Sequence, residues 1–304
     1  MSKQLKADIS LLVVTLSWGS SFILTKNSLG TLETFNFLAI RFLIAFTISS
    51  LIFYKNMNKI DKDTLKYGII IGIILFSGFA LQTLGLNYTT ASKSAFITGF
   101  SVVLVPLLSS ILLKQSPQKK AVVGAFFALI GLALLSLNGK LMLNIGDFYT
   151  LTGSFAYAMH IVIVGKYTVK VDSITLAIIQ IGTVAILSLF TSFTVETPII
   201  PSGEFVWINI FILSIVCTSG AFIIQNAAQK YTTPTHTALI YTSEPVFAAI
   251  FGYFMAGEIL SSKGILGAIL ILFGMLVAEV DFKSLFNKKD LDNKNKDVKD
   301  SLME

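Results

Sequence analysis

Long apolar segments are the feature that most constrains how this chain can fold. Of its 304 residues, 54% are hydrophobic and only 13% are charged. A helix needs about 20 apolar residues to cross the hydrocarbon layer of a membrane. Ten segments approach this length, and we predict that they span a bilayer: residues 8–26, 35–54, 66–86, 95–113, 121–138, 147–166, 174–194, 205–225, 238–257 and 264–280. Because lipid offers no hydrogen bonds to the backbone, the predicted fold class is an all-α polytopic membrane protein with ten transmembrane helices.

The sequence also contains an internal repeat. The segment YTTASKSAFI at residues 88–97 returns as YTTPTHTALI at residues 231–240. Gln82 matches Gln225 at the same offset, whereas Asp8 with Asp147 and Trp18 with Tyr157 match at a slightly shorter offset. The two offsets differ by about one helical turn, which nearly preserves the inward face of a helix. We therefore predict two five-helix repeats, at residues 8–138 and 147–280.

The distribution of lysine predicts the topology. With both termini placed in the cytoplasm, 18 lysines fall on the inner side and four on the outer side, as the positive-inside rule requires. Five spans is an odd number, so the second repeat enters the membrane from the opposite side and the repeats are inverted. We predict a multi-pass protein of the cytoplasmic (inner) membrane. The polar, charged residues 281–304 are predicted to form a disordered cytoplasmic tail.

Composition and motifs argue against several other classes of protein. The net charge of +6 reports topology and anionic lipid, so we predict no nucleic-acid partner. The sequence has no HExxH, GxSxG or GxxxxGK[ST] motif and no cluster of cysteine or histidine at metal-ligand spacing. We therefore predict no catalytic residues, no metal and no cofactor. A membrane-embedded enzyme or receptor is the less favoured alternative.

Two charged residues lie inside predicted spans, where a charge costs at least about 2.5 to 3.5 kcal/mol at the helix centre. Arg41 is either an anchor for a carboxylate of the substrate or a structural arginine that binds backbone carbonyls. Glu244 is either a proton-coupling site or a carboxyl group that hydrogen-bonds a neighbouring helix. The second interpretation arises because the adjacent Pro245 lacks a backbone donor.

Other polar and aromatic residues sit at matched positions in the two repeats. Gln82 and Gln225 are polar, and Trp18 and Tyr157 lie near mid-span instead of at the interfaces where aromatics usually gather. Each is either part of a cavity wall or packed between helices. His160 follows Tyr157 by three residues, on the same helical face. The predicted substrate-binding residues are Trp18, Arg41, Gln82, Tyr157, His160, Gln225 and Tyr241.

Glycines recur at matched positions as well. Gly124 with Gly131, and Gly267 with Gly274, are seven residues apart and allow helices to approach closely. They can pack the two repeats together or form a dimer surface, and we favour internal packing. We predict a monomer or a homodimer.

Several of these residues together resemble a known family. The segment SEPVFAAIFGYFMAGE at residues 243–258 resembles the end of an EamA domain of the drug/metabolite transporter superfamily. Trp18-Gly-Ser-Ser, Arg41 and Tyr88-Thr-Thr-Ala resemble parts of the first EamA domain. The resemblance covers residues 8 to 280. It implies a ten-helix inverted-repeat carrier with a central cavity between the repeats, commonly an exporter or facilitator of amino acids and related metabolites.

From the residues and the resemblance together, we expect a transporter that moves a small polar metabolite across the membrane by alternating access, with an amino acid or a related compound as the first candidate. The alternative is an exporter of drugs or cationic compounds from the same superfamily. The expected partners are a small-molecule substrate and the lipid bilayer.

Overall fold

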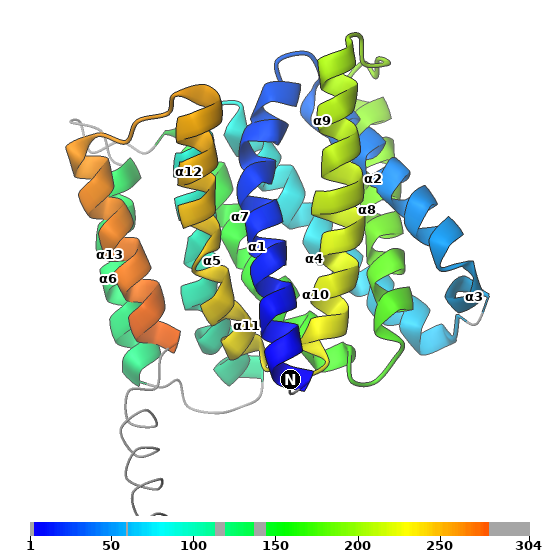
Figure 1. The fold of residues 1–304 in the computed structure, drawn as a ribbon, viewed down its shortest axis with the longest axis horizontal. Helices are drawn as coiled ribbons and strands as arrows, with labels where there is room; N and C mark the ends of the chain where they lie inside the picture. Colours follow the sequence, from blue (N-terminus) through cyan, green and yellow to red (C-terminus); the bar gives the residue numbers. More distant parts are fainter. Residues whose placement is uncertain (1–2, 59, 113–118, 137–143, 280–304) are drawn as a thin grey trace, which may run out of the picture.

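The computed structural model describes residues 3–58, 60–112, 119–136 and 144–279, and the regular structure of this part is helical throughout (Figure 1). The helices are α1 (Lys3–Ser28), α2 (Thr34–Ile52), α3 (Tyr54–Met57), α4 (Lys62–Leu86), α5 (Ala91–Leu112), α6 (Lys119–Ser136), α7 (Ile145–Tyr167), α8 (Ser173–Val195), α9 (Glu204–Ser214), the π-helix η1 (Ile215–Gly220), α10 (Ala221–Gln229), α11 (Pro234–Tyr241), α12 (Glu244–Ala256) and α13 (Ser262–Glu279). The predicted tail at residues 281–304 lies outside the described residues.

The lengths of these helices confirm the polytopic all-α class. Eight helical stretches in the described part are long and apolar enough to cross a membrane. Two of the eight are composite: α9, η1 and α10 together, and α11 with α12. Two further apolar helices, Val122–Leu135 and Ser262–Ala278, are shorter. Each of the ten predicted segments contains a helix within its described residues, but only eight stretches pass the length criterion, so the count of ten spans is not confirmed.

The first helices of the two halves run in opposite directions (Figure 1). Near the end of α1, the Lys26 ammonium donates to the carbonyl oxygen of Thr89, and the hydroxyl of Thr89 donates to Asp147 in the first turn of α7. The end of α1 and the start of α7 therefore lie on the same face of the bundle. We call the face where α1 begins the N-terminal face and the other the opposite face. The boundaries predicted for the two repeats stay a prediction.

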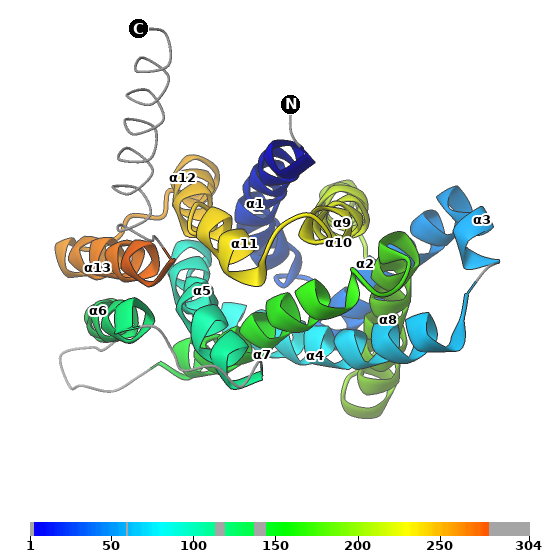
Figure 2. The same ribbon diagram turned by 90° about the horizontal axis from the view of Figure 1, so that it is seen from below.

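Helices at equivalent places in the two halves pack in equivalent ways (Figure 2). The pairing of α4 with α7 is matched by that of α10 with α1. The pairing of α5 with α7 is likewise matched by that of α12 with α1. Two pairs, α2 with α8 and α6 with α13, join a helix to its own counterpart. This pattern is what an approximate two-fold relation between the halves requires.

Close contact between α6 and α13 depends on the matched glycines. A Cβ atom on Gly131 would lie 2.6 Å from the carbonyl oxygen of Gly267, and one on Gly124 would meet that of Gly274. Only glycine permits backbones to approach this closely. The glycines therefore pack α6 against α13 within one chain, which is the internal role that the sequence predicts.

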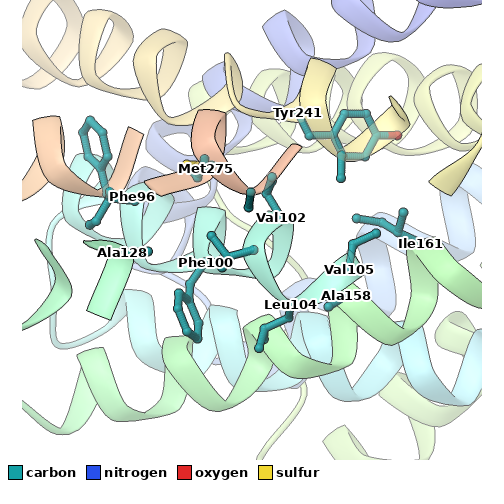
Figure 3. Packing of buried hydrophobic residues seen from close by; sticks show 14 of the residues in the cluster. Phe96, Phe100, Val102, Leu104, Val105, Ala128, Ala158, Ile161, Tyr241 and Met275 are labelled. Carbon is teal, nitrogen blue, oxygen red and sulfur yellow. The ribbon is translucent and has the colours of Figure 1, made fainter. Parts of the chain in front are cut away.

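A large cluster of buried apolar residues surrounds α5 (Figure 3). It joins Phe96 and Phe100 of α5 to Ala128 of α6, Ile161 of α7 and Met275 of α13. In a bilayer the hydrophobic effect does not drive helices together, because lipid is as apolar as the side chains. The cluster therefore stabilises the bundle mainly through the density of its van der Waals contacts.

Two composite stretches in the second half are interrupted near their middle, a feature that the sequence prediction of continuous spans at 205–225 and 238–257 missed. Residues Ile215–Gly220 form a π-helical segment, in which the Thr218 hydroxyl donates to the Leu213 carbonyl oxygen at 2.8 Å. Between α11 and α12 the helix breaks after Tyr241. Pro245 has no N–H to donate to the carbonyl oxygen of Tyr241, so this one helical hydrogen bond is missing at the break.

Candidate binding cavity

A cavity of about 60 Å³ lies inside the bundle, between the two halves. It is lined by residues of α1, α4, α5, α7, α10, α11 and α12: Trp18, Ser21, Phe22, Phe79, Gln82, Thr98, Ser101, Tyr157, His160, Ile161, Phe222, Gln225, Tyr241 and Glu244.

Every residue that lines the cavity has its repeat equivalent on the other wall. The shorter repeat offset, which relates Asp8 to Asp147, connects three pairs: Trp18 with Tyr157, Ser21 with His160 and Phe22 with Ile161. The longer offset, that of the two YTT segments, connects four pairs: Phe79 with Phe222, Gln82 with Gln225, Thr98 with Tyr241 and Ser101 with Glu244. The cavity thus lies where the two repeats meet, which is the usual place for a substrate in carriers built from repeats.

Most of the residues that the sequence predicts for the site line this cavity: Trp18, Gln82, Tyr157, His160, Gln225, Tyr241 and Glu244. Arg41 does not. Its guanidinium carbon lies 5.1 Å from the centroid of the Phe79 ring, and Phe79 itself lines the cavity. Arg41 therefore lies one layer behind the wall.

Arg41 is almost completely buried, with 1% of its surface exposed. Its Nε donates to the Thr218 hydroxyl at 2.8 Å, while Nη2 has no hydrogen-bond partner in the described part of the chain. The residue thus has a structural contact with the π-helical segment and an unused donor. Both of its predicted roles, structural arginine and carboxylate anchor, remain predictions.

On the first-half side, both polar atoms of the cavity glutamine make a hydrogen bond. The hydroxyl of Tyr157 donates to Oε1 of Gln82 at 2.9 Å, and Nε2 of Gln82 donates to the hydroxyl of Thr98 at 2.9 Å. These bonds connect α7, α4 and α5. They fix the orientation of the Gln82 amide, and they leave its oxygen and nitrogen paired with protein groups.

On the second-half side, the equivalent glutamine keeps an unpaired oxygen. Nε2 of Gln229 donates to the carbonyl oxygen of Ile161 at 3.2 Å, so the Gln229 amide oxygen points toward Gln225. Gln225 must then present its Nε2, which donates at 3.1 Å. This chain of bonds leaves Oε1 of Gln225 without a partner among the described residues.

Two more groups on the same side are unpaired. The hydroxyl of Tyr241 is buried and makes no hydrogen bond with any described residue. The carboxyl group of Glu244, at the start of α12, likewise has no hydrogen bond or ion pair within the described part of the chain. Unpaired polar groups in a buried site are costly unless a ligand or water satisfies them. Gln225, Tyr241 and Glu244 thus give this wall three groups whose oxygen atoms can accept hydrogen bonds.

The aromatic residues of the wall are held by contacts with one another and with the π-helical segment. Trp18 packs against Phe222 with ring centroids 5.4 Å apart and against Tyr241 at 5.3 Å. Nε2 of His160 donates to Oε1 of Gln180 at 2.7 Å, since an amide oxygen can only accept. Gln180 is the repeat equivalent of Arg41, so equivalent positions support the cavity in different ways.

Sequence reasoning missed half of the wall: Ser21, Phe22, Phe79, Thr98, Ser101, Ile161 and Phe222. The signal that would have found the two large rings is helical spacing. Phe79 and Phe222 each lie three residues before a matched glutamine, hence on the same helical face. Ser21 follows Trp18 by the same three residues that separate His160 from Tyr157.

The helices are apolar and long enough to cross a membrane, and they enclose a partly polar cavity between two antiparallel halves. These features define a class of protein, the multi-pass membrane transporters. Comparison with known proteins places the chain within this class. It belongs to the EamA-like transporter family, whose sequence profile matches residues 5–137 and again residues 144–279. The resemblance stated from the motifs is thereby confirmed.

The chain is also similar to individual proteins along most of its length. It is 34% identical to an uncharacterised transporter of Archaeoglobus fulgidus, covering 91% of this chain and 87% of that protein. It is 32% identical to the uncharacterised transporter YyaM of Bacillus subtilis, covering 91% and 94%. A solved crystal structure matches the fold with a TM-score of 0.67 at 18% identity, covering 90% of this chain and 96% of the other. The proteins of Archaeoglobus fulgidus and Bacillus subtilis are both named as transporters.

Proposed function

We propose that this protein carries a small polar organic solute with a protonated amine, amino acids included, across the cytoplasmic membrane by alternating access. One observation carries the proposal: Gln225 and Tyr241 have buried oxygen atoms without a partner among the described residues, and Glu244 beside them on the same cavity wall has no hydrogen bond or ion pair there. A primary ammonium group has three hydrogen-bond donors and no acceptor. Such a group can donate to all three of these oxygen atoms at once.

The charge and the aromatic content of the cavity favour the same ligand. Glu244 is the one acidic side chain among the described residues that line it, and no lysine or arginine lines it in that part of the chain. Rings of tryptophan, tyrosine and phenylalanine attract a cation through their faces, by about 0.5 to 2 kcal/mol. Trp18, Tyr157 and Phe222 are among the aromatic residues of the wall. An anionic solute finds no matching charge among these residues.

The carboxylate of an amino acid also has a candidate partner. The Nη2 donor of Arg41 has no partner among the described residues and lies behind the ring of Phe79. We expect Phe79 to turn aside when a zwitterion binds, so that guanidinium and carboxylate meet. A cationic solute without a carboxylate needs no such movement, and it is the second candidate, because Arg41 does not line the cavity in this conformation.

Alternating access follows from the architecture that we infer. Two inverted halves around one site can rock so that the cavity opens to each side in turn. The break between α11 and α12 borders the cavity, and η1 contacts the cavity wall through Trp18, so both interruptions can absorb changes in backbone angle. The excess of lysine on the N-terminal face supports a cytoplasmic location for that face.

Three solutes of matched size test the proposal. Alanine carries an amine and a carboxylate, its amino-alcohol analogue alaninol carries the amine alone, and lactate carries the carboxylate alone. Purified protein is reconstituted in liposomes, and each radiolabelled solute is followed by counterflow against an excess of the same unlabelled solute. Counterflow requires binding on both sides of the membrane, and it needs no coupling ion. Empty liposomes correct for the leak of each compound.

We expect counterflow of alaninol and alanine, and none of lactate. Counterflow of alaninol without alanine favours the second candidate, a carrier of cationic solutes. Counterflow of lactate at a rate equal to that of alaninol would contradict the proposal, since lactate lacks the ammonium group that Glu244 and the aromatic rings are proposed to bind.

A further inference from the structure

Two contacts between a basic and an acidic side chain occupy repeat-equivalent positions at opposite ends of the bundle. On the opposite face, Nζ of Lys93 lies 2.6 Å from Oδ2 of Asp147. On the N-terminal face, Nε2 of His236 lies 3.1 Å from Oδ1 of Asp8. Asp147 follows Asp8 by the shorter repeat offset, and His236 follows Lys93 by the longer one. These are the same two offsets that relate the cavity walls.

Each pair joins two helices that also line the cavity. Lys93 of α5 lies five residues before Thr98, and His236 of α11 lies five before Tyr241. At 1.5 Å per residue, both basic groups stand about 7.5 Å along their helices from the cavity wall. Separating either pair removes a polar link between the two helices at that end.

The acidic members are placed with the same regularity. Asp147 of α7 lies ten residues before Tyr157, and Asp8 of α1 lies ten before Trp18. This is about 15 Å along each helix. The two pairs therefore stand at matching heights on either side of the cavity.

We propose that these pairs are the two gates of the transport pathway: Lys93–Asp147 closes the opposite face, and Asp8–His236 closes the N-terminal face. The proposal rests on the proposed alternating access. A carrier of this kind must hold one end shut while the other opens, and an ion pair that joins two wall helices does so directly. When a repeat is duplicated and inverted, the same two positions give one such pair at each end of the bundle.

The gate on the opposite face is the tighter of the two. The Asp147 side chain is 1% exposed, and its Oδ1 also accepts from the Thr89 hydroxyl at 2.9 Å. Lys26 adds a bond from its ammonium to the Leu86 carbonyl oxygen at 2.9 Å. The ends of α1, α4, α5 and α7 are thus tied together at this face.

The gate on the N-terminal face has fewer contacts. The side chains of Asp8 and His236 are 26% and 36% exposed. Thr232, the repeat equivalent of Thr89, has a hydroxyl with no partner among the described residues. A surface hollow of about 450 Å³ borders the pair, lined by Gln4, Lys230, Tyr231, Thr232, Thr233 and His236.

The two basic residues also differ in a way that makes the gate on the opposite face the stronger one. Lysine stays charged throughout the physiological range, whereas histidine carries a positive charge only when it is protonated. The two gates therefore differ in strength because one repeat has lysine where the other has histidine. We infer that the molecule rests with its opposite face closed and that the N-terminal face opens more readily.

Thiol labelling tests the gates without a transported solute. Cys217 is the only cysteine and is buried, so Cys217→Ser with Ser101→Cys places one thiol in the cavity wall. A membrane-impermeant maleimide is applied from either face of oriented vesicles. We expect faster labelling from the N-terminal face in this background, and Lys93→Ala should raise labelling from the opposite face at least threefold.

Further variants address each gate and its controls. His236→Lys, which copies the tighter gate, should lower labelling from the N-terminal face at least threefold. The charge swap Lys93→Asp with Asp147→Lys should return labelling from the opposite face toward its starting rate. Glu204→Gln and Asp63→Asn remove exposed charges in the first turns of α9 and α4, one on each face, and should change neither rate.

The results separate the gates from the transport function. Unchanged labelling in both Lys93→Ala and His236→Lys would overturn the gate assignment, even if counterflow is intact. Face-specific changes together with no counterflow of any solute would instead contradict the proposed function. A monodisperse elution profile from size-exclusion chromatography checks that each variant folds. A variant that fails this check is replaced by Asp147→Asn or Asp8→Asn, which break the same gates and should open the same faces.

Discussion

The indole N–H of Trp18 donates a hydrogen bond to the backbone carbonyl oxygen of Cys217 at a distance of 3.0 Å. Cys217 lies within the π-helical segment η1, and Trp18 lies in the cavity wall. In a regular α-helix this carbonyl would accept from the amide four residues later. The bond therefore ties an aromatic wall of the cavity to the irregular part of a neighbouring helix.

The loss of this bond should affect stability and transport together. Trp18→Phe removes the donor and leaves a buried carbonyl, which should lower the free energy of unfolding by about 0.5 to 1.5 kcal/mol. Trp207→Phe is the matched control, because its indole also donates to a backbone carbonyl at 3.0 Å, that of Pro201, but lies outside the cavity. Thermal unfolding in detergent and alaninol counterflow measure the two effects. Equal loss of counterflow in both variants would contradict the role of Trp18 in the wall.

Removing the charge of Glu244 should weaken binding of an amine. A hydrogen bond to a charged group contributes about 1.5 to 3 kcal/mol, which corresponds to roughly a 10- to 100-fold change in affinity. We expect Glu244→Gln to raise the apparent KM for alaninol by this factor. Glu204→Gln, at the start of α9, is the control and should leave the KM unchanged. A KM that is the same in Glu244→Gln and in the parent protein would remove Glu244 from the binding site.

Replacing Arg41 should separate the two classes of solute. Arg41→Met keeps most of the buried volume and removes the guanidinium, so the variant is expected to fold. If a carboxylate meets Arg41 behind Phe79, the variant loses counterflow of alanine at least tenfold and retains that of alaninol. An equal decrease for both solutes would show a structural role through the contact with Thr218. Unchanged alanine counterflow would exclude Arg41 as the carboxylate anchor.

The packing of α6 against α13 should tolerate no added atoms. Gly131→Ala places a methyl group against the carbonyl oxygen of Gly267, where backbone must shift, and should cost about 1 to 3 kcal/mol of stability. Gly30→Ala is the control, since its new Cβ would meet its nearest neighbour at an ordinary 3.6 Å. Unfolding followed by circular dichroism compares the two variants. An unaltered unfolding midpoint in Gly131→Ala would contradict the close contact.

Much of this fold could be predicted because a bilayer restricts what an apolar segment can do. Segment lengths and matched residues such as Gln82 and Gln225 led to the helical bundle and to half of the cavity wall. Periodicity alone could not show whether Arg41 lines the cavity. It indicates the helix face on which a side chain lies, but not whether another side chain separates it from the cavity. Here the ring of Phe79 lies between Arg41 and the cavity.

The helix breaks were not predictable for a different reason. Pro106 lies inside a continuous helix, α5, whereas Pro245 coincides with a break between α11 and α12. The same residue type thus gives two outcomes, so a proline in the sequence does not by itself locate a break. The π-helical segment at Ile215–Gly220 has no sequence marker of its own. Its contacts with Trp18 and Arg41 become visible only in three dimensions.

The central claim, that the cavity binds an amine through Glu244, is tested most directly by tryptophan fluorescence. The chain has two tryptophans, so Trp207→Phe leaves Trp18 as the single reporter in the cavity wall. Titration with alaninol should give a saturable change in its emission. Propane-1,2-diol, which replaces the amine by a hydroxyl group, should give none, and adding Glu244→Gln should abolish the response to alaninol. An equal response to the diol, or a response that survives Glu244→Gln, would contradict the account.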